Sequence, residues 1–478
     1  MIRSRWLAVL LAGALVALFW LPAIQVPFWQ DDFRLLLDAR EAREAGEGWF
    51  SAFWPSEKSI FWRPLSEGVY WRVVEGLLHA SPLVAHVLNL LVLTAASLAV
   101  AWLVTDYARV LRPELDWGTT FFIAGLLYGI HAAHFLPAVW VTAVHTSMVV
   151  LFSALTLRFW IAALRQAPAG LTPGLLAIPL LLLPALFSKE SGILVLPLGA
   201  LLTAVAWKRA RPTRAAWFIA VVSLLLALAW LRVRQGMIVP PSGAYEVDLG
   251  VNALRNLASM TLFAFNVPRE SLRFVLEQQS LLAALWGLAC AGLMAAAVWP
   301  VVAGARSRLG VAGAAAVVAF FLIGVAPHLL FSWNAYAYYV TLGLIAWPFL
   351  AVYAGLPPRR MRFVAAAAWL SALLSVGGNH VLDYPALLAR AHWADGQLAL
   401  LREAFPAVAE RARAEGIAVA AENPHKFLGI GIDGLAFTFD LPRTLFREVG
   451  AGESPTGPAV RLIVPDIGDA YFQGWDRE

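Results

Sequence analysis

An acidic pair follows the first apolar run of the chain, as Asp31 and Asp32 in the sequence FWQDDF. Adjacent carboxylates repel each other, so such a pair is expected where it binds a cation or where one member acts as a base. An alternative is that Asp31 caps a helix that begins at Asp32. The pair is the first candidate for catalysis. If the protein uses a divalent cation, it is also the candidate metal site.

Basic residues suited to phosphate form a second group of candidates. Lys189 and Glu190 stand between two apolar runs in LFSKESGILVLP. A lysine there can hold a phosphate as a point charge, and the neighbouring carboxylate can orient it. Arg63, among aromatic residues in FWRPLSEGVYW, suits the same ligand. The alternatives are an interfacial ion pair for Lys189 and Glu190, and a solvated or cation–π arginine for Arg63.

Four further polar residues in apolar surroundings are candidate substrate contacts: His86, His131, His134 and Asn334. A single histidine in a helical bundle more often packs with one hydrogen bond than binds a ligand. His131 and His134 lie three residues apart near an expected helix end, which favours a functional role for that pair. Asn334, in FSWNAYAYYV, could contact an acceptor, a lipid or a neighbouring helix.

The composition indicates that these candidates are held by helices in a membrane. The 478 residues are 60% hydrophobic and 14% charged, with a mean hydropathy of +0.70. Soluble domains carry about 45–50% apolar and about 25% charged residues. The apolar residues occur in long runs rather than in alternation, which excludes a β-barrel. One cysteine excludes a disulfide framework. We therefore expect an all-α polytopic membrane protein.

The apolar runs predict about eleven transmembrane helices. They cover residues 6–24, 83–105, 118–135, 136–164, 171–187, 191–207, 214–234, 281–303, 311–330, 335–355 and 363–380. When these runs are threaded alternately, every short basic loop falls on one side, which is then the cytoplasmic side. The scheme requires segment 236–280 to stay outside, as an interfacial or re-entrant segment.

This threading sets the expected location of each part. We expect a multi-pass protein of a bacterial inner membrane with a cytoplasmic N-terminus. The long first loop, 26–82, and residues 384–478 are expected outside, in the periplasm or beyond. Residues 1–383 carry 27 Lys and Arg against 18 Asp and Glu. Because membrane orientation explains this basic excess, no nucleic-acid partner is expected.

The chain is predicted to have two domains, with the membrane domain at 1–383. Residues 384–478 predict a small extracytoplasmic α/β domain. A helical pattern there stops at Gly416, and three strand-like runs follow: IAVAA, LAFTFDL and AVRLIVPD.

The order of these motifs resembles the polytopic GT-C glycosyltransferases, over about residues 1–355. The nearest branch is the protein O-mannosyltransferase-like enzymes, including those joined to tetratricopeptide repeats. The family's first-loop acid matches Asp31 or Asp32. Its R-P-L, H-x-x-N and S-K-E motifs match Arg63-Pro64-Leu65, His86 with Asn89, and Ser188-Lys189-Glu190. The family's H-P motif is changed here, with Ala132 in place of proline, and no repeat array follows.

The resemblance implies a glycosyltransferase with a polyprenyl-phosphate sugar as donor. Lys189 and Arg63 would neutralise the phosphate, and an aspartate would deprotonate a hydroxyl of an acceptor protein, lipid or glycan, with inversion at the sugar. No cofactor is certain for this chemistry. The acidic pair leaves a divalent cation possible. The main alternative is a transporter or flippase of a lipid-linked substrate. However, the polar groups gather at the outer edge rather than at the midplane, and the sequence has no inverted repeat.

Overall fold

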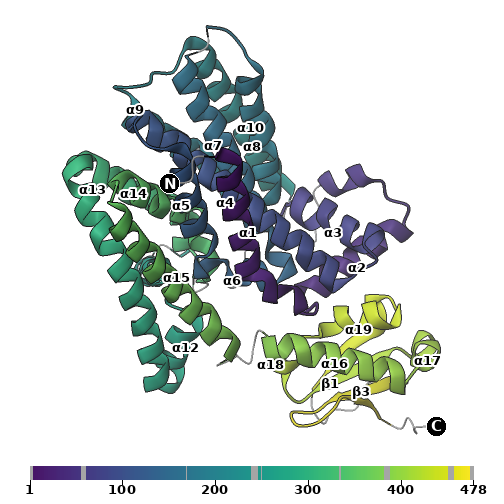
Figure 1. Ribbon diagram of the computed structural model, residues 1–478. Helices are drawn as coiled ribbons and strands as arrows, with labels where there is room; N and C mark the ends of the chain where they lie inside the picture. Colours follow the sequence, from purple (N-terminus) through teal and green to yellow (C-terminus); the bar gives the residue numbers. More distant parts are fainter. Residues whose placement is uncertain are drawn as a thin grey trace.

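The computed structural model describes residues 4–54, 61–167, 169–237, 246–248, 250–332, 335–381, 388–450 and 457–473. Figure 1 shows a bundle of long helices, with a small domain that contains a sheet at one end. The predicted fold class is confirmed: a mostly helical, multi-pass membrane protein with a small C-terminal α/β domain.

Within the described residues, seven helices are long and apolar enough to cross a membrane. They lie in α1 (Arg5–Trp20, continued by η1, Leu21–Gln25), α4 (Pro82–Leu111), α7 (Val144–Gln166), α10 (Arg214–Met237), the two halves of α13 (Leu281–Leu329) and α15 (Pro358–Val381). An eighth span results if α5 (Trp117–Gly129) is counted together with the segment Ala132–Val139, which is bent from it by 56°. Gly310, at φ +62°, separates the two halves of α13.

Three shorter apolar helices account for the remaining predicted spans. They are α8 (Pro173–Ser188), η7 with α9 (Glu190–Ala206), and η10 with α14 (Gly343–Ala354). A helix of 16 residues rises about 24 Å, less than the roughly 30 Å of a hydrocarbon layer. The eleven predicted runs therefore all form helices, but only seven or eight of those described have the length of a complete span.

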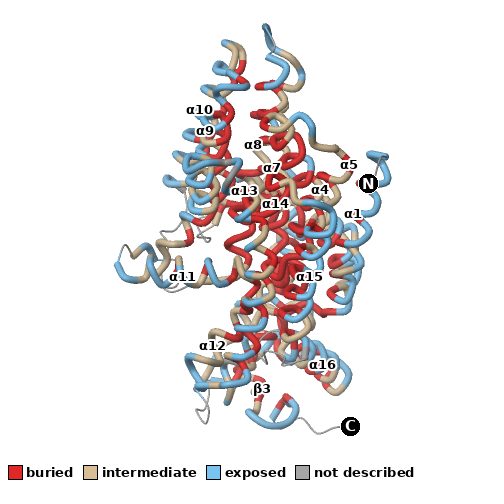
Figure 2. Tube along the Cα trace, turned by 60° about the vertical axis from the view of Figure 1, so that its left-hand side comes forward, coloured by how far each residue is buried: buried red, intermediate tan, exposed pale blue. Residues whose placement is uncertain are grey.

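The outer surface of the bundle is apolar. Large side chains on its long helices are well exposed, including Leu10, Leu225 and Leu288. Figure 2 shows the buried residues along the centre of the bundle and exposed residues on its outside. Apolar side chains on the outside of a helical bundle are expected where lipid, not water, surrounds it.

In the part of segment 236–280 that the structure describes, no helix beyond the end of α10 qualifies as a span. Its helices are α11 (Asn252–Ala264) and α12 (Arg269–Gln278). The amide of Asn256 donates to the carbonyls of Leu329 and Phe331, where α13 ends. Figure 2 shows α11 standing out from the side of the bundle. The lengths of α11 and α12 agree with an interfacial or re-entrant segment, and its location outside stays a prediction.

The first loop forms short helical turns that rest on the bundle. It contains α2 (Asp31–Glu44), the π-helical turns η3 (Pro64–Val69) and η4 (Val73–Leu77), and α3 (Tyr70–Arg72) between them. The hydroxyl of Ser66 donates to the carbonyl of Ser188, at 2.7 Å. This bond fixes the loop to the end of α8, next to Lys189. The other short elements are η2 (Trp49–Phe53), η5 (Ala132–His134), α6 (Phe135–Val139), η6 (Val141–Ala143) and η9 (Ala337–Val340).

The C-terminal domain has a four-stranded sheet in the order β2-β1-β3-β4. Two of the predicted strands are confirmed, as β1 (Ile417–Ala421) and β3 (Val460–Val464), which pair in parallel. The third prediction is wrong: LAFTFDL lies in and just after the helix α19 (Gly431–Phe439). Periodicity does not separate a short apolar run of a strand from that of a buried helix. The remaining elements are α16 (Leu388–Ala404), α17 (Val408–Glu415), α18 (Pro424–Phe427), η11 (Arg443–Leu445), β2 (Phe446–Val449) and β4 (Tyr471–Phe472).

The C-terminal domain and α2 share one apolar core. Phe33 and Leu36 of α2 belong to the same buried cluster as Leu435 and Phe439 of α19. The Gln30 backbone N–H donates to the Gly429 carbonyl, at 3.0 Å. The last part of the chain thus positions the helix that begins at the acidic pair. The predicted domain boundary, between 383 and 384, lies outside the described residues.

Candidate functional site

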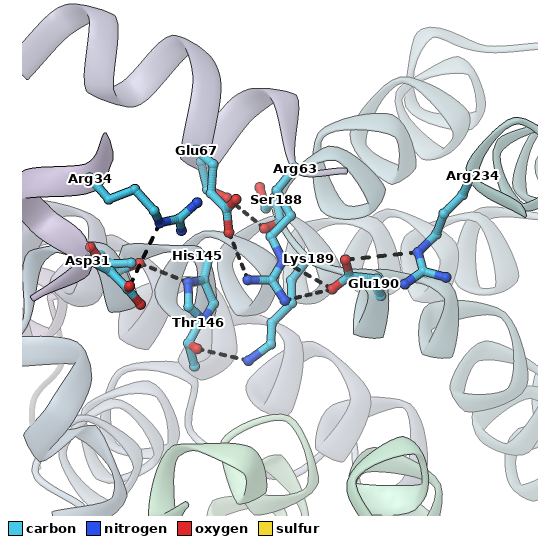
Figure 3. A network of polar contacts seen from close by, with 12 residues as sticks. Asp31, Arg34, Arg63, Glu67, His145, Thr146, Ser188, Lys189, Glu190 and Arg234 are labelled. Carbon is cyan, nitrogen blue, oxygen red and sulfur yellow. Dashed lines mark hydrogen bonds and ion pairs between the residues drawn. The ribbon is translucent and has the colours of Figure 1, made fainter. Parts of the chain in front are cut away.

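A cavity of about 380 Å³ lies where the first loop meets the bundle, and we refer to it as the cavity. Seven charged residues line it: Asp31, Arg34, Arg63, Glu67, Lys189, Glu190 and Arg234. Figure 3 shows them converging from the first loop, the end of α8 and α10. The sequence candidates Asp31, Arg63, Lys189 and Glu190 are therefore brought together, although they are far apart in the chain.

Arg63 is held in place by two carboxylates. It is 9% exposed. Its Nε and Nη2 donate to Oε2 of Glu190, at 3.0 and 2.9 Å, and its Nη1 donates to Oε1 of Glu67, at 2.9 Å. Phe61 lies under the guanidinium group, with its ring centroid at 3.8 Å. Burial raises the pKa of Glu67, and the charge of Arg63 opposes that rise. Glu190 thus orients Arg63, whereas the sequence pattern pairs it with Lys189.

Lys189 follows α8 in an extended conformation that directs it into the bundle. It is 5% exposed. Its Nζ donates to the Thr146 hydroxyl, at 3.2 Å, and lies 4.7 and 5.2 Å from the ring centroids of Tyr338 and Tyr339. The ammonium group of Lys189 has three N–H donors, and the hydrogen bond to Thr146 uses one of them. The lysine therefore has donor capacity for an anion in the cavity.

The two members of the acidic pair differ sharply. Asp31 lines the cavity, its side chain is 49% exposed, and it lies 3.7 Å from Arg34. Asp32 is 0% exposed. Its Oδ1 accepts from the N–H and hydroxyl of Thr142, at 2.8 and 2.6 Å, and its Oδ2 accepts from the N–H of Trp29, at 3.2 Å. Burial raises the pKa of Asp32 to about 7.

These contacts assign the pair different roles. Asp32 ties the start of α2 to the turn that precedes α7. Asp31 is the member that could reach a substrate. The capping alternative for Asp31 is wrong, because α2 begins at Asp31 itself and its N-cap is Gln30, which makes no side-chain capping bond.

The described residues do not offer a metal site at the pair. No group of three His, Cys, Asp or Glu among them could hold a metal ion. Both oxygens of Asp32 accept hydrogen bonds, and Asp31 lies beside Arg34. The pair thus does not provide the set of oxygen ligands that a divalent cation requires.

His86 and Asn89 contact backbone groups of the bent segment rather than the cavity. Nδ1 of His86 lies 3.2 Å from the Ala138 carbonyl. The Asn89 amide donates to the Pro137 carbonyl, at 2.6 Å. These contacts hold α6 against α4. The matching H-x-x-N motif therefore has a structural role in this chain, and substrate contact by His86 stays a prediction.

His131 and His134 make comparable contacts. Nε2 of His131 lies 3.2 Å from the Ala264 carbonyl, and Nε2 of His134 lies 3.1 Å from the Tyr128 carbonyl. Neither residue is among those that line the cavity. Their contact with substrate stays a prediction, and Asn334 lies outside the described residues.

Several lining residues were not predicted. Glu67 follows Arg63 by four residues, a spacing that brings side chains together on a helix, so this pair could have been found. Arg234, with its Nε 3.9 Å from Oε1 of Glu190, had no recognisable signal in the sequence. His328 stacks on Tyr339 with ring centroids 3.9 Å apart. This contact forms because the end of α13 lies against η9, which the sequence alone does not indicate.

The fold and site define a multi-pass membrane protein with a charged, half-enclosed cavity at one end of its bundle. No protein-family model and no curated protein sequence matches the chain. Among solved structures, it is similar to arabinofuranosyltransferase AftD from Mycobacteria, with a TM-score of 0.48, 17% identity, and coverage of 87% of this chain. It spans only 29% of AftD.

A second similar structure is ArnT from Cupriavidus metallidurans bound to undecaprenyl phosphate. The TM-score is 0.49 and the identity 15%, over 95% of this chain and 92% of ArnT. Similarities at this level describe the general course of the chain and carry no information on substrate.

Proposed function

We propose that the protein is an integral membrane glycosyltransferase of the GT-C type. It would transfer a sugar from a polyprenyl-phosphate donor to a hydroxyl of an acceptor on the outer side of the membrane. One observation carries the proposal: Asp31, Arg63 and Lys189 line one cavity, between a polar loop and an apolar bundle. The motif order that resembles the protein O-mannosyltransferase-like branch supports it independently.

In this proposal the donor phosphate binds between Lys189 and Arg63. Burial, followed by the charge of Arg63, lowers the pKa of Lys189. A bound phosphate would favour the ammonium form of the lysine, because opposite charges attract strongly where water is largely excluded. The polyprenyl chain would leave the cavity along its apolar wall, which includes Trp230 and Leu231 of α10. An apolar cavity of about 400 Å³ lies farther along α8, α9 and α10 and could receive it.

The transfer step would use Asp31 as general base. Its carboxylate takes the proton of the acceptor hydroxyl, and the acceptor oxygen forms a bond to the anomeric carbon from the face opposite the phosphate. The bond between that carbon and the phosphate oxygen breaks, and its electron pair leaves with polyprenyl phosphate. Lys189 and Arg63 stabilise the charge that develops on this leaving group. Asp32 acts as a positioning residue, through Thr142.

The acceptor would enter from the first loop, where Asp31 is exposed. A hydroxyl on a protein, a lipid or a glycan meets the chemical requirement equally. The C-terminal domain contacts α2 beside Asp31 and would form part of the acceptor's approach.

The function is tested by two measurements. Mass spectrometry of envelope glycoproteins and glycolipids, with the gene deleted and restored, should reveal a missing sugar and its acceptor. The purified protein in liposomes should then transfer label from a synthetic polyprenyl-phosphate sugar. A transporter or flippase, the alternative, would move the labelled lipid between leaflets and form no glycosylated product. That result would overturn the proposal.

A further inference from the structure

A groove of about 880 Å³ lies between α1, α4, α5 and α7, and we refer to it as the groove. Its charged lining consists of Arg5, Arg109, Arg158, Arg165 and Asp106. Helix α7 connects it with the cavity: Thr146, the partner of Lys189, is near its start, and Arg165 follows 19 residues later, a rise of about 29 Å. Arg165, at the charged end of the groove, thus lies about one hydrocarbon thickness from Thr146 along α7.

The charges of the groove do not balance. The single carboxylate, Asp106, lies 3.3 Å from Nε of Arg158 and 3.8 Å from Nη1 of Arg165. Four guanidinium groups against one carboxylate leave a net charge of +3. In addition, Nε of Arg109 is buried and has no hydrogen-bond acceptor within the described residues. A buried, unmatched donor is costly unless a ligand supplies its acceptor, so an anion is expected here.

Aromatic rings fix the arginines at one end of the groove. The Arg158 guanidinium lies 4.1 Å from the Trp102 ring centroid and 4.9 Å from that of Phe159. Arg5 lies 5.5 Å from the Trp117 ring centroid. Most of the remaining lining is apolar and includes Leu98, Leu151 and Leu155. The groove is therefore cationic at one end and apolar along its length, as a bound phospholipid requires.

The depth of the charges agrees with a lipid headgroup. Arg158 stands eight residues before the end of α7, or about 12 Å. The polar interfacial layer on each side of a bilayer is about 5–7 Å thick. The arginines thus extend from the headgroup layer into the first part of the hydrocarbon, where a charged side chain is costly and commonly marks a binding site.

We propose that the groove binds one anionic phospholipid from the leaflet at this end of the bundle. The phosphate lies among Arg5, Arg109 and Arg158, and the acyl chains follow the apolar wall. The short basic loops predict that this end is cytoplasmic, where basic pockets between helices meet anionic headgroups. This site is independent of the proposed glycosyl transfer and involves no reaction.

The test uses the full-length protein, delipidated in detergent, and native mass spectrometry. Phosphatidylglycerol and phosphatidylcholine with identical acyl chains are titrated separately. Phosphatidylglycerol should bind more tightly, and Arg109→Gln should weaken its binding about fivefold, as expected for one arginine near a headgroup. Arg5→Ala, at the exposed first turn of α1, should weaken it by a similar factor. Raising salt from 0.1 to 1 M should reduce the preference, because Arg5 and Arg165 of this groove are exposed and salt screens exposed charges.

Matched controls locate the lipid. Arg360 is exposed near the start of α15, outside the groove, so Arg360→Ala should leave both affinities unchanged. The preference should also persist in Lys189→Ala, which removes a cation from the cavity. Equal binding of the two lipids, or equal losses in Arg109→Gln and Arg360→Ala, would overturn the proposal. So would displacement of phosphatidylglycerol by millimolar inorganic phosphate, since that would indicate a free-anion site.

Discussion

At the cavity, Arg63 and Lys189 are buried, and each donates hydrogen bonds to other side chains. At the groove, Arg5 is exposed, and the buried Nε of Arg109 has no hydrogen-bond acceptor among the described residues. Both regions are lined by four basic side chains and several aromatic rings. Their carboxylates differ: three line the cavity, and one lines the groove.

This difference indicates what each region can do. Carboxylates that orient an arginine fix its geometry before a substrate arrives, and such preorganisation is what transition-state stabilisation requires. An excess of loosely matched arginines attracts an anion without fixing its orientation tightly, which suits a lipid headgroup. Arginine would therefore serve the proposed transfer reaction at the cavity and the proposed binding of a lipid headgroup at the groove.

The contrast between the cavity and the groove requires that the two ends of the helical bundle face different compartments. A reporter enzyme that is active only outside the cytoplasm should be fully active when fused after Pro424 and silent when fused after Arg211, in the basic loop between α9 and α10. The reason is the one-sided distribution of basic loops. Activity at Arg211 with silence at Pro424 would place the cavity inside and reverse the assignment of the two ends.

The largest graded effect is expected from Asp31→Asn. The change preserves size and removes basicity, so glycosyl transfer should fall about 10²–10⁴-fold, the usual contribution of a general base. Initial rates in liposomes with a labelled donor measure it. Glu44→Gln, at an exposed position of the same helix, is the matched control and should have no effect. Near-normal transfer by Asp31→Asn, with an unchanged melting temperature, would remove Asp31 as the base and leave Glu67 as the next carboxylate to test.

Lys189→Ala should reduce transfer about 10²-fold, because one preorganised partner of the leaving phosphate is lost. Lys189→Arg should lose less, since it keeps the charge. Direct binding of a polyprenyl-phosphate sugar to the purified variants separates affinity from rate. The proposed phosphate contact would be wrong if the alanine variant bound the donor as tightly as the wild type.

The smallest effect concerns Asp32 and pH. The pKa of Asp32 is raised from its ordinary value of 3.8 to about 7, chiefly by burial, so the folded state favours the protonated form. Its contribution to stability is complete below about pH 4 and is lost as the pH rises through about 7. The melting temperature should therefore fall between pH 5 and pH 8, by about 1 °C per kcal/mol for a chain of 478 residues. Asp32→Asn should flatten that slope, whereas Asp395→Asn, at an exposed position of α16, should not.

Much of the fold could be predicted because a membrane imposes strong rules. Long apolar runs identified the helices of the bundle, of which seven or eight among the described residues have the length of a span. The residue types of Asp31, Arg63 and Lys189 identified candidates that the structure brings to one cavity. The weaker predictions involved short elements. The run LAFTFDL packs as the helix α19, since local periodicity over seven residues does not determine its partner.

The separate roles of Asp31 and Asp32 could not be predicted from two identical neighbours. The difference arises from Thr142, 110 residues away, whose backbone and hydroxyl both donate to Asp32. Likewise, the contact of His86 with the Ala138 carbonyl depends on a bend that its own motif does not encode. Such assignments require tertiary structure.

The shared core of α2 and the C-terminal domain has a consequence for the timing of biosynthesis. Arg40 of α2 pairs with Asp440, 400 residues later, at 2.9 Å. At about 5–20 residues per second, a ribosome needs roughly 20–80 s to cover that distance. During this interval α2 can pack against Trp71 and Val74 of the first loop but lacks its contacts with α19. In the proposed enzyme, the helix that begins at Asp31 would therefore reach its final position only after α19 has been synthesised.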